Sequence, residues 1–288
     1  MKTNIFDIKL FFITSISLLF LGLNSIFCKA VLVNNDMDAY SFTFFRLFFA
    51  AITLVVIYLF KTKKFVFSTK SNWISSFMLF LYAVCFSYSY LSIEAGFGTL
   101  LLFGVVQIVM MISSFFYKEK ISIQKIVGLV ISFFGLAYLL FPKESFEVSY
   151  FYSFLMIISG IAWAFYTILG KKSSDSLFNT MDNFIKATLF VILFYFLFVF
   201  ETLHFTSYGL FFAFISGSIT SALGYVLWYE VLPKIDILTA GIIQLFVPII
   251  SIIVSIIFLS EVLTINLVIS TVLVSIGIII SLYSKKIK

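Results

Sequence analysis

Polar and aromatic side chains inside long apolar stretches are the residues of this 288-residue sequence with chemistry to offer. Polar groups are costly inside a bilayer, so those found there are candidates for contact with a solute. Amide and aromatic groups bind polar, zwitterionic or ring-bearing metabolites without supplying a fixed charge. The candidate substrate-binding residues are Asn24, Tyr82, Tyr88, Gln107, Trp163, Tyr166, Tyr225, Trp228 and Gln244.

Two aromatic pairs among these candidates have helical spacing. Trp163 and Tyr166 are three residues apart, as are Tyr225 and Trp228, so each pair shares one face of a helix. The alternative interpretations are hydrogen bonds that join helices and aromatic side chains that mark the membrane interface.

Pro248 predicts an interrupted helix. It has no N–H to donate to the carbonyl of Gln244, four residues earlier, so the helix should kink there. Broken helices near the bilayer midplane are frequent at transporter sites, and a tolerated kink is the alternative. Pro248 is therefore grouped with Lys29 and Arg46 as a candidate gating residue.

Lys29 and Arg46 are expected near the outer ends of the first two apolar stretches. There they could attract a substrate carboxylate at the outer mouth. The alternative is that their long side chains snorkel to the headgroups or pair with Asp36 or Asp38.

The sequence offers little for catalysis or metal binding. No Asp, Glu or His lies near the centre of a predicted helix, and His204 falls in an outer loop. Cys28 and Cys85 are read as small apolar fillers. We therefore predict no catalytic residue, metal ligand or cofactor, a pocket without ionisable groups, and export that is facilitated or weakly coupled to protons.

The elements that position these residues are apolar helices. The sequence is 62% hydrophobic, with a mean hydropathy of +1.16, and only 11% charged; a soluble domain is about 25% charged. Stretches of about 20 apolar residues are long enough to span a bilayer. Ten are expected, at 10–33, 40–60, 73–92, 98–117, 124–141, 150–170, 181–200, 208–230, 237–258 and 264–283.

The basic residues predict the orientation. With the N-terminus inside, most of the 19 Lys and Arg fall on the cytoplasmic side, and acidic residues crowd the outer loops. The first apolar stretch is too long for a cleavable signal peptide. We expect a multi-pass protein of a bacterial inner (plasma) membrane with both termini cytoplasmic.

The two halves of the chain resemble each other at a shift of 142 residues. Residues 118–124 (KEKISIQ) align with 260–266 (SEVLTIN), Gly135 with Gly277, and Lys29 with Lys171. The first of the two aligned loops is basic and the second has no Lys or Arg, as expected if they lie on opposite sides.

This similarity predicts an internal repeat, with residues 1–145 and 146–288 as the two units. Each unit holds five expected helices, and five is odd, so the second unit enters the membrane from the opposite side. Inverted repeats suit alternating access, because related halves can form two mirror-related packings.

Small residues recur on the last helix of each unit. Gly128 and Gly135 have counterparts in Ser270 and Gly277. Small residues permit close helix contact, so they predict either a homodimer through these helices or their packing within one chain.

These motifs together resemble the EamA-type branch of the drug/metabolite transporter superfamily, over nearly the whole chain. The resemblance implies ten helices around a central cavity, with the fifth and tenth at the side. Two positions depart from the family pattern: Val106 replaces a proline expected in the fourth helix, and Leu21-Gly22 replaces a Trp-Gly pair. The phrases that carry it are 42–51 (FTFFRLFFAA), 116–122 (FYKEKIS), 163–167 (WAFYT), 227–229 (LWY), Pro248 and 259–263 (LSEVL).

The resemblance implies an exporter of small metabolites, with amino acids or related neutral and zwitterionic solutes as the nearest analogy. The alternatives are a multidrug efflux carrier, a non-transporting scaffold or partner subunit, and, least favoured, a lipid-modifying membrane enzyme. The expected partners are a small-molecule substrate and the bilayer, not nucleic acid.

Overall fold

The structure, a computed structural model, describes residues 8–64, 72–119, 122–140, 149–199 and 203–282. These residues are helical apart from short turns and one isolated bridge between Met37 and Phe205. The first half contains α1 (Ile8–Val33), α2 (Ala39–Thr62), α3 (Trp73–Ser89), α4 (Ala95–Phe116) and α5 (Ile123–Leu140). The second half contains α6 (Tyr150–Gly170), α7 (Ser176–Phe198), α8 (Ser207–Ile215), η1 (Ser216–Leu223), α9 (Gly224–Val231), η2 (Leu232–Lys234), α10 (Ile237–Gln244), α11 (Phe246–Phe258) and α12 (Ile265–Leu282).

Several of these elements continue one another. The π-helical segment η1 joins α8 to α9 in one rod, and α10 and α11 form another rod that is interrupted at Leu245. Each apolar stretch predicted from the sequence therefore corresponds to one helix or one rod. The helix predicted at 181–200 begins earlier, because the Asp175 side chain accepts a hydrogen bond from the Phe178 N–H and caps α7.

Seven of these helices and rods are long and apolar enough to cross a membrane: α1, α2, α4, α6, α7, Ser207–Lys234 and Ile237–Phe258. The helices α3, α5 and α12 are also apolar, and their lengths of 17 to 18 residues lie at the lower limit for a span. The prediction of an all-helical, multi-pass membrane protein is thus confirmed.

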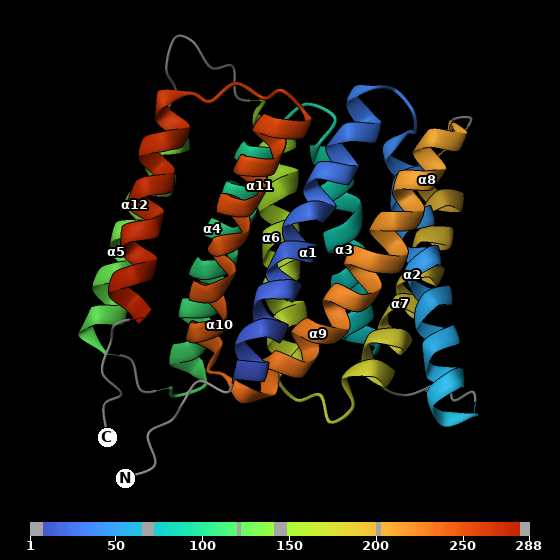
Figure 1. Cartoon of the computed structure of the whole chain (residues 1–288), viewed down its shortest axis with the longest axis horizontal. Coiled ribbons are helices and arrows are strands. Elements are labelled where there is room, and N and C mark those ends of the chain that lie inside the picture. Colours follow the sequence, from blue (N-terminus) through green and yellow to red (C-terminus); the bar gives the residue numbers. More distant parts are fainter. Residues whose placement is uncertain (1–7, 65–71, 120–121, 141–148, 200–202, 283–288) are drawn as a thin grey trace.

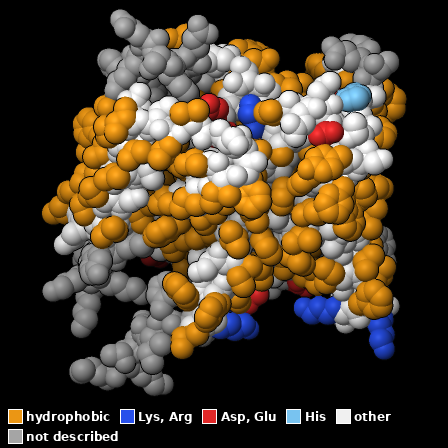
Figure 2. Space-filling model, turned by 45° about the horizontal axis from the view of Figure 1, so that its top comes forward, with side chains coloured by type: hydrophobic (Ala, Val, Ile, Leu, Met, Phe, Trp, Pro, Cys, Tyr) orange, Lys and Arg blue, Asp and Glu red, His pale blue; other side chains and the backbone are white. Residues whose placement is uncertain are grey.

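The outer surface has the character of a lipid-facing one. Large apolar side chains such as Phe60 and Phe116 are more than 80% exposed. Figure 2 shows an apolar band across the molecule, with most of the visible Lys and Arg side chains gathered along its lower edge. The described chain begins at this same edge in Figure 1, and successive helices cross between the two edges.

The helices pack as a core and a side pair. In the core, α3 packs on α6, α2 on α7, and α4 on α6, α10 and α11, while α1 packs on η1, α9 and α11. The pair α5 and α12 lies at one end of the molecule (Figure 1).

Small residues bring α5 and α12 together. A Cβ added at Gly128 would overlap the carbonyl oxygen of Gly277, and one added at Gly277 would overlap that of Gly128. The carbonyl of Ser270 lies against Gly135 in the same way. These residues are used for packing within the chain, which is one of the two alternatives left open by the sequence.

Candidate substrate site

Five aromatic residues from α3, α6 and α9 form one buried group, here called the aromatic cluster: Tyr82, Trp163, Tyr166, Tyr225 and Tyr229. The Trp163 ring centre lies 4.9 Å from that of Tyr82 and 5.0 Å from that of Tyr225. Tyr166 lies 5.5 Å from Trp163 and 4.9 Å from Tyr229. Edge-to-face and tilted contacts at such distances are favourable and hold the rings in fixed orientations.

The Gln244 side chain joins this cluster from α10. Its Oε1 accepts a hydrogen bond from Trp163 Nε1 at 2.6 Å, and its Nε2 donates to the Ala240 carbonyl at 3.1 Å. The helix is interrupted at the next residue, Leu245, upstream of Pro248. A hydrogen bond therefore joins α6, which carries Trp163, to α10, which carries Gln244, beside a helix break.

Arg46 lies inside the protein, not at the headgroups. Its side chain is 1% exposed, and its Cζ lies 5.1 Å from the Phe86 ring centre, 5.5 Å from that of Tyr82 and 5.9 Å from that of Phe42. Because α2 begins at Ala39, Arg46 is about 10 Å along the helix from its N-terminal end. The expectation that Arg46 snorkels, and that the interior contains no ionisable group, is therefore wrong.

A second buried charge is balanced. Lys186 donates to Asp182 at 2.6 Å, and neither side chain is exposed. Asn72 also donates to this carboxylate at 3.0 Å, and Lys186 lies 5.1 Å from the Trp73 ring centre. This pair was not predicted from the sequence, although a spacing of four residues on one helix is a usual signal for an ion pair.

Asn24 binds the π-helical segment. Its Oδ1 accepts hydrogen bonds from Ser216 at 2.8 Å, Thr220 at 2.7 Å and Ser221 at 3.2 Å. π-Helical insertions are rare and are frequent at functional sites. Asn24 therefore joins α1 to an unusual segment of the rod that also carries Tyr225.

Two glutamates hold the N-termini of helices in the other half of the chain. Glu119, after α4, accepts from the N–H groups of Ile237 at 2.8 Å and Leu238 at 3.2 Å, at the start of α10. Glu261, after α11, accepts from those of Ala95 at 2.5 Å and Gly96 at 3.1 Å, at the start of α4. Helix N-termini have free N–H groups and a positive partial charge, so a carboxylate is stabilised there.

Each glutamate has a lysine nearby. Lys171 lies 3.7 Å from Glu119 and donates to the Ile235 carbonyl at 2.6 Å. Lys29 donates to the Tyr90 carbonyl at 3.0 Å and is electrostatically coupled to Glu261. Lys29 is thus bound at the α3–α4 turn.

Asp36 and Asp38 are engaged elsewhere. Asp38 caps α2 through the Ser41 N–H and also accepts from the His204 N–H at 2.7 Å. Asp36 accepts from the Thr206 hydroxyl at 3.1 Å. The turn after α1 is therefore joined to the start of α8, and the pairing of these acids with Lys29 or Arg46 that the sequence allowed is not what the structure shows.

The EamA-like transporter family model matches the chain twice, at residues 9–141 and 151–283. The chain belongs to the EamA-like transporter family. The resemblance drawn from the sequence motifs is thereby confirmed.

Individual relatives agree with the family match. The chain is 34% identical over 245 residues to an uncharacterized protein of Pseudomonas aeruginosa, covering 85% of this chain and 84% of the relative. It is 24% identical over 261 residues to the uncharacterized transporter YoaV of Bacillus subtilis, covering 87% and 89%. A crystal structure superposes with a TM-score of 0.69 at 12% identity, over 93% of this chain and 98% of the other, and shows the shared fold alone.

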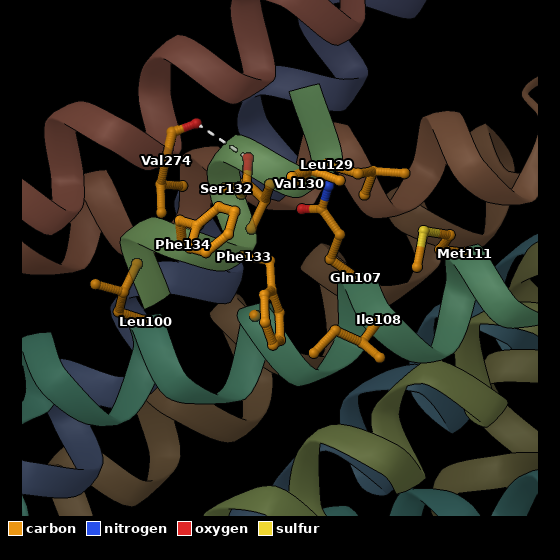
Figure 3. Close-up of a pocket in the computed structure, with 12 residues that line it drawn as sticks. Leu100, Gln107, Ile108, Met111, Leu129, Val130, Ser132, Phe133, Phe134 and Val274 are labelled. Atoms are coloured by element: carbon orange, nitrogen blue, oxygen red, sulfur yellow. Dashed lines mark hydrogen bonds between the residues drawn. The ribbon is translucent and has the colours of Figure 1, made fainter. Parts of the chain in front are cut away.

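In this EamA protein Gln107 does not join the aromatic cluster. It lies in a separate pocket between α4 and the α5–α12 pair, with a volume of about 320 Å³ (Figure 3). Neither its amide oxygen nor its amide nitrogen has a hydrogen-bond partner among the described residues. The lining is almost wholly apolar and consists of Leu100, Gly104, Gln107, Ile108, Met111, Leu129, Val130, Ser132, Phe133, Phe134, Leu245 and Val274.

The remaining two candidates, Tyr88 and Trp228, also lie outside the aromatic cluster. Tyr88 lines a cavity of about 220 Å³ near the end of α3 and the start of α2, beside Tyr40 and Leu91. Trp228 is fully buried in α9, and its Nε1 has no partner in the described part of the chain. The structure thus brings together Tyr82, Trp163, Tyr166, Tyr225 and Gln244, with Arg46 against Tyr82.

Proposed function

We propose that this EamA protein exports small metabolites, most directly amino acids or related neutral or zwitterionic solutes, by alternating access. In this proposal the chain has ten spans, arranged as two inverted five-helix repeats at residues 1–145 and 146–288. The observation that carries the proposal is the pair of reciprocal carboxylate caps made by Glu119 and Glu261.

The two caps correspond residue by residue. A shift of 142 residues places Glu119 on Glu261, and it places the capped N–H groups of Ala95 and Gly96 on those of Ile237 and Leu238. The two family matches begin and end at the same shift. The Glu119 cap lies at the end of the molecule where α1 begins, and the Glu261 cap lies at the opposite end (Figure 1), which supports inversion of the second unit.

The helix packing supports the same relation. If α1 corresponds to α6, α2 to α7, α3 to the α8–α9 rod and α4 to the α10–α11 rod, then each major contact has a counterpart. The contact of α3 with α6 matches that of α1 with α9, and the contact of α4 with α6 matches that of α1 with α11. When the halves are exchanged, the α2–α7 and α5–α12 contacts return the same pairs of helices, and the α4–α10 contact returns a contact between α4 and the α10–α11 rod.

The aromatic cluster lies between two polar cavities at opposite ends. One, of about 410 Å³, is lined by Asn72, Ser173 and Tyr229 at the end where α3 begins. The other, about 220 Å³, contains Asp38 and Tyr88. Because Tyr229 belongs to the cluster, the first cavity ends against it. A site reached from each end in turn is what alternating access requires.

The orientation proposed from the charge pattern places both termini in the cytoplasm of a cell with this protein in its inner (plasma) membrane. A homodimer through α5 and α12 would have to use their outer faces, because their small-residue faces pack on each other. The expectation of facilitated or weakly coupled export is kept, since the buried carboxylate of Asp182 already binds Lys186.

Transport by the full chain tests the proposal. Cells that overproduce it are expected to release one or more metabolites into the medium, found by untargeted profiling, and proteoliposomes are expected to exchange the same compound labelled. Trp163→Ala should abolish exchange, whereas Phe196→Leu, at a ring that is 71% exposed on the outer surface, should preserve it.

Three outcomes would refute or redirect the proposal. An unchanged medium together with proteoliposomes that exchange nothing would support a scaffold. Resistance to unrelated cationic drugs would favour multidrug efflux. A strong proton-antiport current would contradict facilitated export.

A further inference from the structure

Arg46 is a buried cation for which the described protein supplies no matching anion. It is 1% exposed, it makes no ion pair within 4.0 Å among the described residues, and its Nε and Nη1 atoms have no hydrogen-bond partner there. An isolated charge in a low-dielectric interior is strongly unfavourable. A charge kept in such a place inside a membrane protein therefore calls for a functional explanation.

Other interior cations of this chain have a counterion or a carbonyl acceptor among the described residues. Lys186 binds Asp182, and Lys171 binds Glu119 and a main-chain carbonyl. Lys29 donates to a main-chain carbonyl. The difference at Arg46 is therefore specific to this position.

The guanidinium contacts the aromatic cluster through Tyr82. The Tyr82 ring lies 5.5 Å below Arg46 Cζ and 4.9 Å from Trp163, and its hydroxyl accepts from that of Tyr225 at 3.3 Å. Aromatic faces attract the guanidinium weakly, and its Nε and Nη1 groups, which have no partner among the described residues, stay open to another acceptor. They also supply surfaces on which an apolar or ring-bearing solute can pack.

The π-helical segment lies directly against Arg46. A Cβ added at Gly217 would meet the Arg46 carbonyl oxygen, so only glycine allows η1 to approach α2 this closely. Irregular backbone at this depth is a usual feature of transporter binding sites. Arg46 therefore lies between the aromatic cluster and the π-helical segment η1 of the α8–η1–α9 rod.

We propose that Arg46 binds the carboxylate of the transported solute, and that the substrates are small monocarboxylates with an apolar or aromatic side group. The inference rests on the proposed transport function and narrows its substrate class. The planar guanidinium matches a carboxylate through two parallel hydrogen bonds. A singly charged anion neutralises Arg46, whereas a phosphate monoester would carry a second negative charge into the interior without a partner.

Matched acids and amides test the proposal on the purified full chain in lipid nanodiscs. The probes are L-phenylalanine, L-leucine and 3-phenylpropionate as carboxylates, L-phenylalaninamide, L-leucinamide and 3-phenylpropanamide as their amides, and phenyl phosphate. Binding is measured by thermal stabilisation and by calorimetry. At least one carboxylate is expected to bind, with its amide and phenyl phosphate at least about tenfold weaker.

Substitutions test whether Arg46 is the residue that binds the carboxylate. Arg46→Gln should weaken carboxylate binding roughly 10- to 100-fold, and Arg46→Lys should recover part of it, because it restores the charge but not the paired geometry. Lys234→Gln, which removes an exposed cation, should leave binding unchanged. The comparison of acid with amide on the wild-type chain needs no variant, so a misfolded Arg46→Gln protein does not affect the test.

The proposal is overturned if an amide binds as tightly as its acid, if no carboxylate of the set binds, or if folded Arg46→Gln keeps wild-type affinity. Exchange in proteoliposomes separates these failures from failure of the transport proposal. Exchange of a compound that lacks a carboxylate would refute the role of Arg46 and leave the transport function standing. Exchange of nothing would refute the transport function itself.

Discussion

Replacing either capping glutamate by glutamine should shift the access equilibrium, and the two replacements should shift it in opposite directions. Glu261 joins the turn after α11 to the start of α4 through two N–H groups, at the end that faces outward in the proposed orientation. Glu119 does the same for α10 at the end where α1 begins, which faces the cytoplasm in that orientation. Glu261→Gln should therefore favour opening to the outside, and Glu119→Gln opening to the cytoplasm.

The expected size follows from the bonds that are lost. Glutamine keeps one acceptor oxygen, so one of the two hydrogen bonds disappears, along with the charge that faces the helix N-terminus. A hydrogen bond to a charged group contributes about 1.5–3 kcal/mol, and the interaction with the helix dipole about 0.3–1 kcal/mol. A net change of about 2–3 kcal/mol alters the ratio of outward-open to inward-open molecules roughly 30- to 150-fold.

Cysteine labelling in intact cells and inverted vesicles measures this ratio. The native Cys28 and Cys85 are buried and are first replaced by alanine. Reporter cysteines then replace Leu91, in the wall of the outer cavity, and Ser173, in the wall of the inner one. A membrane-impermeant maleimide should label the outer reporter faster in Glu261→Gln and the inner reporter faster in Glu119→Gln.

Each glutamate variant is the control for the other, because the chemical change is the same and only the end of the molecule differs. Equal acceleration at both reporters would indicate general loosening and would refute the reasoning. Unchanged labelling in both variants would show that the caps contribute nothing to closure.

Three further substitutions have definite expected outcomes. Gly128→Ala should lower the stability of the protein in detergent by about 1–3 kcal/mol, measured by thermal unfolding, because its Cβ would overlap the backbone of α12 at Gly277. Asp182→Asn should destabilise by about 3–5 kcal/mol, because it leaves the Lys186 charge buried without its counterion, and adding Lys186→Met should restore much of that loss. Gln107→Leu should stabilise the protein by about 1–3 kcal/mol without reducing transport, since neither polar atom of its amide has a partner among the described residues of this apolar pocket; loss of transport would instead place Gln107 in the substrate path.

Most of the fold could be predicted from the sequence, because hydropathy alone determines where bilayer-spanning helices form. The likeness between residues 118–124 and 260–266 predicted related positions, and the two glutamates in these segments each cap a helix of the other half. The π-helical insertion at Ser216–Leu223 was not predicted, because no local sequence signal distinguishes it from ordinary helix.

The site was predicted only in part, because a helix that is apolar on all sides does not show which face points inward. Gln107 and Gln244 were therefore both predicted to bind substrate, yet they lie in different surroundings. Arg46 was misplaced for another reason: its nearness to the outer end suggested snorkelling, but α2 packs with that face toward α3. Side-chain direction depends on how the helices pack, which hydropathy does not encode.

The reciprocal glutamates also bear on how the halves of this chain depend on each other. Glu119 belongs to the first half and Glu261 to the second, yet each satisfies amide groups that begin a helix of the other half. In a half produced alone, one helix N-terminus would have no capping carboxylate, and one glutamate would have no helix N–H groups from which to accept hydrogen bonds. The two halves should therefore complete one another when produced together as separate chains, and neither should accumulate when produced singly.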